Sequence, residues 1–369
     1  MKNSFGNNLK ITVFGESHGP AIGAVIDGLA SGIKIDMDYI SKKLSKRRPS
    51  GQISTARQEA DNFEILSGVK NGYSCGTPIC IIIRNSSQHS ADYNSINSLA
   101  RPGHADYTAF LKYHGFEDRS GGGHQSGRIT AAVVAAGAII QSALESKGIY
   151  IGTHVKKCAG ISDRDFDFKS LKSDIDNIAF DNFPVLDRKA GDKMQELILS
   201  AKSDCDSVGG VTETVVLNVP QGIGEPWFET AESMLSYAIF SVPAVKGIEF
   251  GDGFAISDKK GSEANDGYKI SGGKIISETL HNGGILGGIT DGSPLLFRCA
   301  VKPTPSIAKK QKTVDFEKNE DTEIEIKGRH DPCIVHRAAA VIDAMTAVTI
   351  ADLCVTRFGT DWLRKTGEK

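Results

Sequence analysis

The stretch from Arg101 to Arg128 is rich in residues suited to chemistry. Two of its three histidines, His104 and His124, stand in its most distinctive motifs and can titrate near neutral pH, and its two terminal arginines suit planar anionic groups. Three consecutive glycines, Gly121–Gly123, allow backbone N–H groups to approach a ligand closely. We therefore expect a site for a phosphorylated or carboxylated molecule with a proton donor beside it. A glycine turn with surface arginines is the simpler alternative for any one of these residues.

Short strands and long helices must position this stretch. Ser120 and Ser126 precede a predicted helix over Ile129–Ser146, and a helix N-terminus favours anions. Asp36 is expected to cap a helix over Met37–Lys46. Alternating or β-branched runs predict strands at Leu9–Phe14, Ile22–Ile26, Phe63–Leu66 and Ile79–Ile83.

The order of elements in the first part of the chain recurs later. Ala24–Ile33 resembles Val215–Ile223, and Arg128–Ala138 resembles Arg337–Ala347. We predict one domain over 1–369, with possible repeat halves 9–150 and 204–358 and a polar, solvated insertion at 151–203 that carries one helix near Lys189–Ser200. A G-x-G-x-x-G fingerprint after a strand is absent, so the fold class expected is α+β, a layered sandwich with an internal pseudo-twofold duplication.

Four further clusters could serve the same site. Ser17 and His18 sit between glycines at a strand end, where His18 suits a proton donor to an anionic leaving group or a structural turn. Arg47 lies in the basic segment that ends the first predicted helix. This positive charge could merely interact with the helix dipole. Lys302–Ser306 fits a ligand-binding loop or a surface turn equally well. Asp331, among basic residues, suits a base or an N-cap.

Composition excludes several classes of protein. The chain has 369 residues, 40% of them hydrophobic, and a net charge of −2, so no global charge favours nucleic acid or an anionic membrane. Seven scattered cysteines and a polar N-terminus without a signal sequence indicate a cytoplasmic protein with reduced thiols. We expect no apolar run long enough to span a membrane. Metal binding is disfavoured because arginines separate the candidate ligands.

Taken together, these motifs resemble the chorismate synthase family. The matching segments follow the family's order along nearly the whole chain: Phe14–Gly19, Arg47–Pro49, Ile65–Gly68, Arg101–Tyr107, Gly121–Arg128, Ala244–Glu249 with Gly251–Gly253, Gly283–Gly288, Lys302–Thr304 and Gly328–Cys333.

The resemblance implies a lyase of the shikimate pathway, in aromatic amino acid biosynthesis. It would convert 5-enolpyruvylshikimate 3-phosphate to chorismate and phosphate by 1,4-anti elimination, with reduced FMN as cofactor, as a homotetramer. Ser17 and His18 would lie by the departing phosphate, His104 would protonate the reduced flavin, and Asp331 would assist proton removal. Arg47, Arg101, Arg128 and Arg329 would bind substrate. The flavin contacts implied are His124, Gln125, Ser126, Pro243, Ala244, Gly287, Lys302, Pro303, Thr304, Pro305, Ser306 and Arg329.

Two other functions are compatible with these loops. One is an NADPH-linked flavoprotein oxidoreductase, and the other is a non-catalytic anion-binding module. The chain has no recognisable nicotinamide-binding motif, so NADPH enters only as a possible reductant of the flavin. An external reductant is therefore expected.

Overall fold

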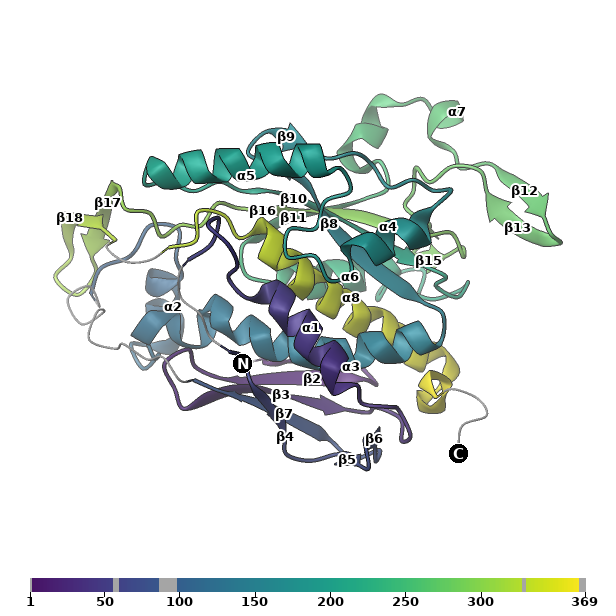
Figure 1. Ribbon diagram of the computed structural model, residues 1–369, viewed down its shortest axis with the longest axis horizontal. Helices are drawn as coiled ribbons and strands as arrows, with labels where there is room; N and C mark the ends of the chain where they lie inside the picture. The colour runs from purple at the N-terminus through teal and green to yellow at the C-terminus, as the bar shows by residue number, and fades with distance from the viewer. Residues whose placement is uncertain (1, 56–59, 86–97, 327–329, 365–369) are drawn as a thin grey trace.

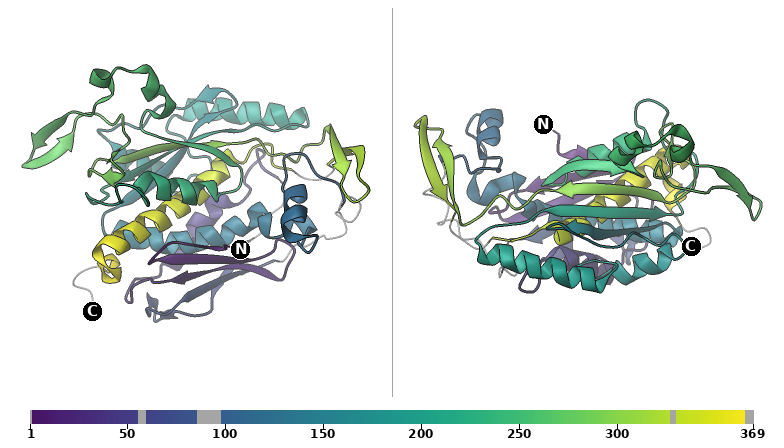
Figure 2. Two further views of the ribbon diagram at one scale, coloured as in Figure 1. Left: turned by 180° about the vertical axis from the view of Figure 1, so that it is seen from behind. Right: turned by 90° about the horizontal axis from the view of Figure 1, so that it is seen from above.

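Two antiparallel five-stranded sheets enclose a layer of helices in the computed structural model, which describes residues 2–55, 60–85, 98–326 and 330–364 (Figures 1 and 2). The first sheet has the strand order β1 (Ser4–Phe5), β2 (Lys10–Gly15), β3 (Ala21–Asp27), β7 (Ile79–Arg84) and β4 (Phe63–Ile65). The second has the order β11 (Val245–Phe250), β16 (Leu295–Val301), β10 (Gly210–Leu217), β8 (Tyr150–Cys158) and β9 (Ile161–Ser162). The predicted strands of the first half are therefore confirmed.

Four helices fill the space between the sheets: α1 (Met37–Arg47), α3 (Thr130–Ser146), α6 (Ala231–Phe240) and α8 (Val335–Phe358). Asp36 caps α1 as predicted, because its side chain accepts a hydrogen bond from the Tyr39 N–H at 2.9 Å. Helices α3 and α8 cross closely, since a Cβ on Gly137 would lie 2.4 Å from the Ala344 Cβ. The β-α-β layered sandwich of the α+β class is confirmed.

The central helices are apolar on nearly all sides. Gly127–Ser146 and Val335–Phe358 are long and apolar enough to cross a membrane by length and composition, but 83% and 100% of their apolar windows are buried inside the protein. The expectation that no apolar run reaches this length overlooked Val335–Phe358. Its buried position between two sheets explains its composition, because a helix covered on both sides needs no polar face. All seven cysteines are free thiols.

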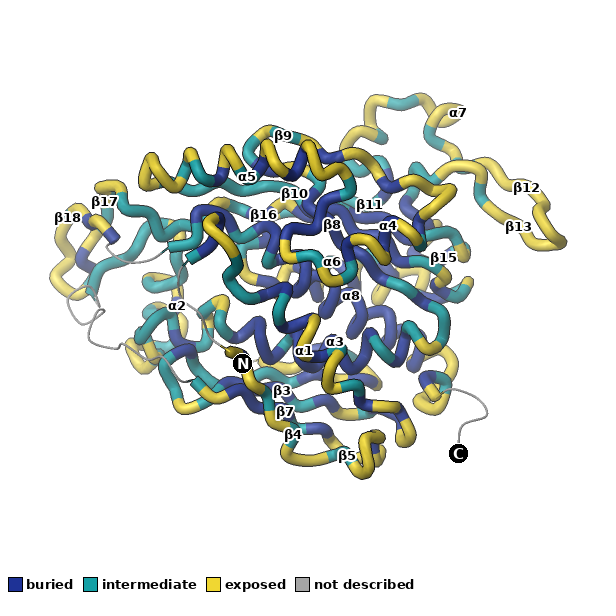
Figure 3. The backbone as a smooth tube through the Cα atoms, viewed as in Figure 1, coloured by how far each residue is buried: buried dark blue, intermediate teal, exposed yellow. Residues whose placement is uncertain are grey.

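Smaller elements decorate the sandwich. Helices α4 (Leu171–Ile178) and α5 (Arg188–Ser203) lie on the outer side of the second sheet, and α2 (Asp106–Tyr113) lies at one end of the molecule (Figure 1). Figure 3 shows that the β12–β13 hairpin is mostly exposed, in contrast to the buried centre. The remaining elements are β5 (Val69–Lys70), β6 (Tyr73–Ser74), α7 (Gly261–Ala264), β12 (Tyr268–Ser271), β13 (Lys274–Ser277), β14 (Ile285–Leu286), β15 (Ile289–Thr290), β17 (Lys310–Asp315) and β18 (Glu320–Glu325).

Strand β8 shows that the first residues of the predicted polar insertion at 151–203 belong to the core. This strand pairs with β10 inside the second sheet, and Ile151–Val155 are all buried. The prediction rested on the many Asp and Lys residues of this segment, yet even His154 in the strand is fully buried and satisfied, because its ring nitrogens lie 2.8 Å from Asp163 and 3.2 Å from Glu213. Polar composition therefore disguised a core strand, since paired polar groups tolerate burial.

The two sheets share one connectivity. The order β2-β3-β7-β4 in the first corresponds to β8-β10-β16-β11 in the second, with α1 and α6 in the same place between strands and α3 and α8 following the last strand. We propose an internal duplication whose second half begins at β8, at residue 150 and not at 204. The start was misplaced because polar residues in β8 hid the counterpart of β2.

Candidate active site

The glycine loop at the start of α3 lies against the loop that follows β2. Gly121, Gly122 and Gly123 all have positive φ angles, of 60°, 89° and 53°. A Cβ on Gly121 would lie 1.9 Å from Cε1 of His18, and a Cβ on Gly123 would lie 2.0 Å from the Asp118 carbonyl oxygen. Glycine is therefore required twice over here, by backbone conformation and by close approach.

Ser17 and His18 lie behind this glycine loop. The buried Ser17 hydroxyl donates to the carbonyl oxygens of Ser120 at 3.0 Å and Gly121 at 3.2 Å. The Ser17 N–H donates to the Gly123 carbonyl at 3.1 Å. The two predicted phosphate-side residues thus contact Gly121, which itself lines a cavity, although neither side chain lines that cavity.

Replacing Gly121 by alanine is expected to displace His18. The added Cβ overlaps the imidazole, so we expect a loss of stability of roughly 2–5 kcal/mol from crowding and backbone strain combined. Gly148→Ala is the matched control, since it also has a positive φ, 81°, but would meet no atom within 4 Å. Urea unfolding of both variants measures the difference. Equal losses of stability in the two variants would show that His18 moves aside without a cost in free energy.

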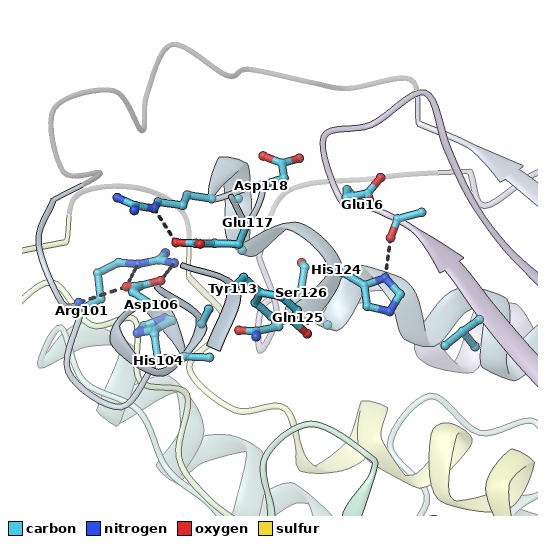
Figure 4. A pocket seen from close by; sticks show the side chains of 18 of the residues that line it. Glu16, Arg101, His104, Asp106, Tyr113, Glu117, Asp118, His124, Gln125 and Ser126 are labelled. Atoms are coloured by element: carbon cyan, nitrogen blue, oxygen red, sulfur yellow. Dashed lines mark hydrogen bonds and ion pairs between the residues drawn. The ribbon is translucent and has the colours of Figure 1, made fainter. Parts of the chain in front are cut away.

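The first cavity has a volume of about 600 Å³ and lies between β2, α2 and the glycine loop (Figure 4). It is lined by residues that the sequence singled out and by several that it did not: Arg101, His104, Gly121, Gly122, His124, Gln125, Ser126 and Ser306 among the first, and Glu16, Asp106, Tyr113, Glu117, Asp118 and Arg119 among the second. The His124 Nδ1–H donates to the Gly15 carbonyl at 2.7 Å. This bond ties the glycine loop to the end of β2.

His104 is held between two loops. Its Nδ1 lies 3.1 Å from the Pro102 carbonyl, which fixes Nδ1 as the protonated nitrogen. Its Nε2 therefore accepts from the Ser306 hydroxyl, at 2.7 Å. Burial, together with the positive charge of Arg101, lowers the pKa of His104 to about 4. His104 is therefore neutral at pH 7 in the free protein.

Arg101 is clamped by a carboxylate from α2. Its Nε and Nη2 donate to the two Asp106 oxygens at 2.8 and 2.7 Å, a bidentate pair. The Arg101 backbone N–H donates to the same carboxylate at 3.0 Å. The arginine is thereby fixed at the rim of the first cavity.

A second cavity, of about 300 Å³, adjoins the first at Ser126 and Gly127. It is lined by the arginines Arg47, Arg128 and Arg337, the carboxylates Asp61 and Asp331, and neighbours that include Thr55, Thr130 and Pro243. In the described part of the chain, three guanidinium groups thus face two carboxylates around one small cavity. The excess of positive charge suits an anionic ligand.

Asp331 is oriented by contacts from two elements. It accepts from the Thr55 N–H at 2.9 Å and pairs with Arg337 in the first turns of α8. Arg337 in turn donates to the Arg47 carbonyl at 2.7 Å. The predicted alternative, an N-cap, is not what this carboxylate does, because α8 begins at Val335 with Ile334 as its cap and no side-chain capping bond.

The remaining predicted contacts divide into those near the two cavities and one far away. Lys302 donates from Nζ to the Gly103 carbonyl at 2.6 Å, and its N–H donates to the Ala244 carbonyl at 3.0 Å. The segment Lys302–Ser306 therefore lies beside His104. Arg329 lies outside the residues that the structure describes.

Gly287 is a predicted flavin contact that the structure places far from the other predicted contacts. It lies in the β14–β15 turn, and its neighbour Gly288 accepts from the Ala231 N–H at the start of α6 at 2.9 Å. Gly222, which bonds to Thr290 of β15, faces Arg357 near the end of α8. Since α8 has 24 residues and is about 36 Å long, Gly287 lies at the opposite end of that helix from Asp331.

Sequence reasoning missed the partners that hold the arginines. Asp61, Asp106, Asn85 and Arg337 were not predicted as site residues. Asn85 bridges two loops, because it donates to the Glu16 and Gly19 carbonyls and accepts from Arg128 Nε at 3.1 Å. Arg337 had a signal, since the repeat aligns it with Arg128, and Asp106 lies within the matching segment Arg101–Tyr107. In the parts of the chain that the structure describes, no group of three or more His, Cys, Asp or Glu could hold a metal ion.

The layered fold and these two joined cavities are typical of an enzyme that acts on a small molecule, and the arginines suit one that is anionic. The chorismate synthase family profile matches residues 9–355. The chain belongs to the chorismate synthase family, lyases of the shikimate pathway.

Curated relatives and a solved structure agree with this assignment. A chorismate synthase of Dehalococcoides mccartyi is 45% identical over 356 residues, covering 96% of this chain and 97% of the relative. One from Archaeoglobus fulgidus is 44% identical over 350 residues, covering 95% and 96%. A crystal structure of chorismate synthase superposes with a TM-score of 0.77 at 27% identity, covering 96% of this chain and 94% of that one.

Proposed function

We propose that this enzyme converts 5-enolpyruvylshikimate 3-phosphate to chorismate and phosphate by 1,4-anti elimination, with reduced FMN bound. The observation that carries the proposal is the junction of two cavities at Ser126 and Gly127, one lined by His104 and the glycine loop and the other by three arginines. A substrate with one phosphate and two carboxylates requires several cations, and the second cavity supplies them.

The first cavity fits a flavin on two observations. Its volume of about 600 Å³ lies in the usual range for a ligand of that size. The Thr304 hydroxyl is buried and has no hydrogen-bond partner among the residues that the structure describes, and it lies beside Ser306, which lines the cavity. We infer that His124–Ser126 and Lys302–Ser306 hold the flavin. Reduced flavin, when bound, supplies electron density that eases cleavage of the C–O bond.

The chain's own residues handle anions and protons in this proposal. Arg47 and Arg128 bind substrate anions, with Arg101 and Arg329 as further contacts. We assign His18 as the acid for the departing phosphate, because its ring lies against Gly121, which lines the first cavity, and Ser17 holds Gly121 through its bonds to Ser120 and Gly121. Asp331, held by Thr55 and Arg337, assists removal of the substrate proton.

His104 is expected to titrate near pH 4 in the free protein. Its unfolded pKa is about 6.5, so the unfolded chain binds the extra proton first as the pH falls. The stability that neutral His104 contributes is therefore complete above about pH 6.5 and is lost as the pH falls toward 4. An anionic ligand in the first cavity should raise this pKa and so make His104 a better proton donor.

An NMR titration of the His104 ring protons measures both values. The His104→Gln variant assigns the signal, and added FMN reports the upward shift of the midpoint. A midpoint above 6.5 in the free protein would contradict the environment described above.

An anaerobic assay tests the reaction itself. Protein, photoreduced FMN and substrate are mixed, and chorismate absorbance and released phosphate are followed. We expect product only when the flavin is reduced. Product with another cofactor, or none with reduced FMN, would refute the cofactor assignment. Substrate-independent, stoichiometric oxidation of NADPH would instead favour the oxidoreductase, and binding without turnover would favour the anion-binding module.

We infer that the working form is a cytoplasmic homotetramer. Large apolar side chains are exposed on the single chain, with Trp227, Phe228 and Phe254 each more than 80% exposed, as is typical of surfaces that pack against another copy. The distance of Gly287 from the two cavities is compatible with a flavin contact supplied by a neighbouring copy. The mass of the assembly measured in solution, compared with 39.5 kDa for one chain, tests this inference.

A further inference from the structure

Asp61 is a buried carboxylate at the centre of the arginine cluster. Its side chain is fully buried, and it lies just before β4 with a positive φ of 48°. One oxygen, Oδ2, lies 3.3 Å from Arg47 Nη2 and 3.6 Å from Arg48 Nε. The other oxygen, Oδ1, accepts from Arg128 Nη1. One carboxylate thus contacts three arginines from two different helical segments.

Among the residues that the structure describes, arginines outnumber carboxylates around Asp61. Arg47 is only 5% exposed, and it also donates to two neutral groups, the Gly127 carbonyl at 3.2 Å and the Thr130 hydroxyl at 3.3 Å. Burial raises the pKa of Asp61, but Arg47, Arg128 and Arg48 outweigh it and lower the pKa below its usual value. Burial lowers the pKa of Arg47 to about 10, so this arginine stays charged at neutral pH. Asp61 is therefore an anion in contact with three cationic side chains.

The backbone of Asp61 indicates that this position is imposed by its contacts. A positive φ is uncommon for a residue other than glycine, and such strain persists where the surroundings demand it. The two oxygens point to different arginines, both of which line the second cavity. Removing the carboxylate would leave two neighbouring guanidinium groups to repel each other.

We propose that Asp61 is a positioning residue, an internal counter-ion that holds Arg47 and Arg128 in their anion-binding orientation while the cavity is free of substrate. This inference rests on the proposed function only in taking these two arginines as substrate contacts. Asp61 orders these two long side chains before the substrate binds. A substrate anion therefore meets guanidinium groups that are already in place.

Thermal unfolding with inorganic phosphate tests the proposal without the reaction. In Asp61→Asn the amide keeps the shape but loses the charge, so we expect a lower Tm without phosphate. Phosphate should then stabilise the variant less than the wild type, because without the carboxylate the two guanidinium groups are no longer held in their anion-binding orientation. Asp61→Glu keeps the charge and should respond to phosphate as the wild type does. Glu64→Gln is the matched control, since Glu64 makes an exposed pair with Arg84 at 2.9 Å.

Steady-state kinetics adds a measurement that a purely structural role would not move. We expect the KM of Asp61→Asn for the phosphorylated substrate to rise on the order of tenfold, with kcat changed less, because charged hydrogen bonds orient the binding groups. Asp61→Glu should recover most of the KM.

Several results would overturn the proposal. Equal phosphate stabilisation of wild type and Asp61→Asn would show that Asp61 is not a counter-ion, and a lower KM in Asp61→Asn would show that it competes with substrate. If Asp61→Asn does not fold even with phosphate, an Asp61→Glu variant whose phosphate response differs from the wild type would also refute it. Wild-type protein that makes no chorismate, while the phosphate responses hold, would refute the proposed function and leave the counter-ion intact.

Discussion

Arg128→Ala is expected to lower kcat/KM for the phosphorylated substrate by on the order of a hundredfold to a thousandfold. This arginine lines the second cavity and donates to Asp61 and, at 3.1 Å, to Asn85. Its removal takes away a substrate cation and also leaves Asp61 with less compensation inside the cavity, so repulsion of the anionic substrate adds to the loss. Steady-state kinetics with reduced FMN measures the effect.

Arg188→Ala is the control for the loss of an arginine. Arg188 pairs with Asp181, and its side chain is 67% exposed on the outer side of the molecule, so the same change there should leave kcat/KM within about twofold. Added guanidinium ion should partly restore Arg128→Ala and leave the control unchanged. A loss below tenfold in Arg128→Ala would show that the second cavity is not where the substrate anions bind.

His104→Ala is expected to lower kcat by about a hundredfold to ten-thousandfold, the range typical of a lost general acid or base. The change removes a buried ring that bonds to the Pro102 carbonyl at 3.1 Å and to Ser306 at 2.7 Å, yet leaves the arginine cavity untouched. Substrate binding should therefore survive while turnover fails. Rapid-quench measurement of a single turnover separates these two effects.

His281→Ala is the matched control for His104→Ala. His281 also has two polar partners, both at Nδ1, which lies 2.7 Å from Asp252 and 3.1 Å from Lys259, but it lines a separate cavity that shares no lining residue with the two described above. We expect its kcat to stay close to that of the wild type. Activity of His104→Ala within threefold of the wild type would refute the assignment of His104 to proton transfer.

The secondary structure of the first half could be predicted from the sequence because its signals are local. Alternating β-branched residues, the Asp36 cap and a long Ala/Val/Ile run each report on their own few residues, and β2, β3, α1 and α3 lie where those patterns put them. The glycine loop was also predictable in kind, since three adjacent glycines indicate a positive-φ, close-approach segment. Strand β8 was missed because its polar residues are satisfied by partners distant in sequence.

The carboxylate partners of the arginines could not have been found in the same way. Arg47 lies at the end of α1 and Asp61 just before β4, and Arg128 reaches the same carboxylate from the start of a different helix. Nothing in the spacing of these residues specifies that pairing, because it depends on how α1 and α3 pack against each other. The same holds for His104, whose neutral state follows from burial and from Arg101.

The sequence alone determined which side chains this protein brings to its chemistry, where its main helices lie and that it belongs to a layered α+β class, because residue type and periodicity are properties of a local stretch. Only the tertiary structure decided that Arg47 and Arg128 share Asp61, that His104 meets Ser306, and that Gly287 lies at the far end of α8. These are contacts between elements distant in sequence, and packing of the helices between the two sheets sets them.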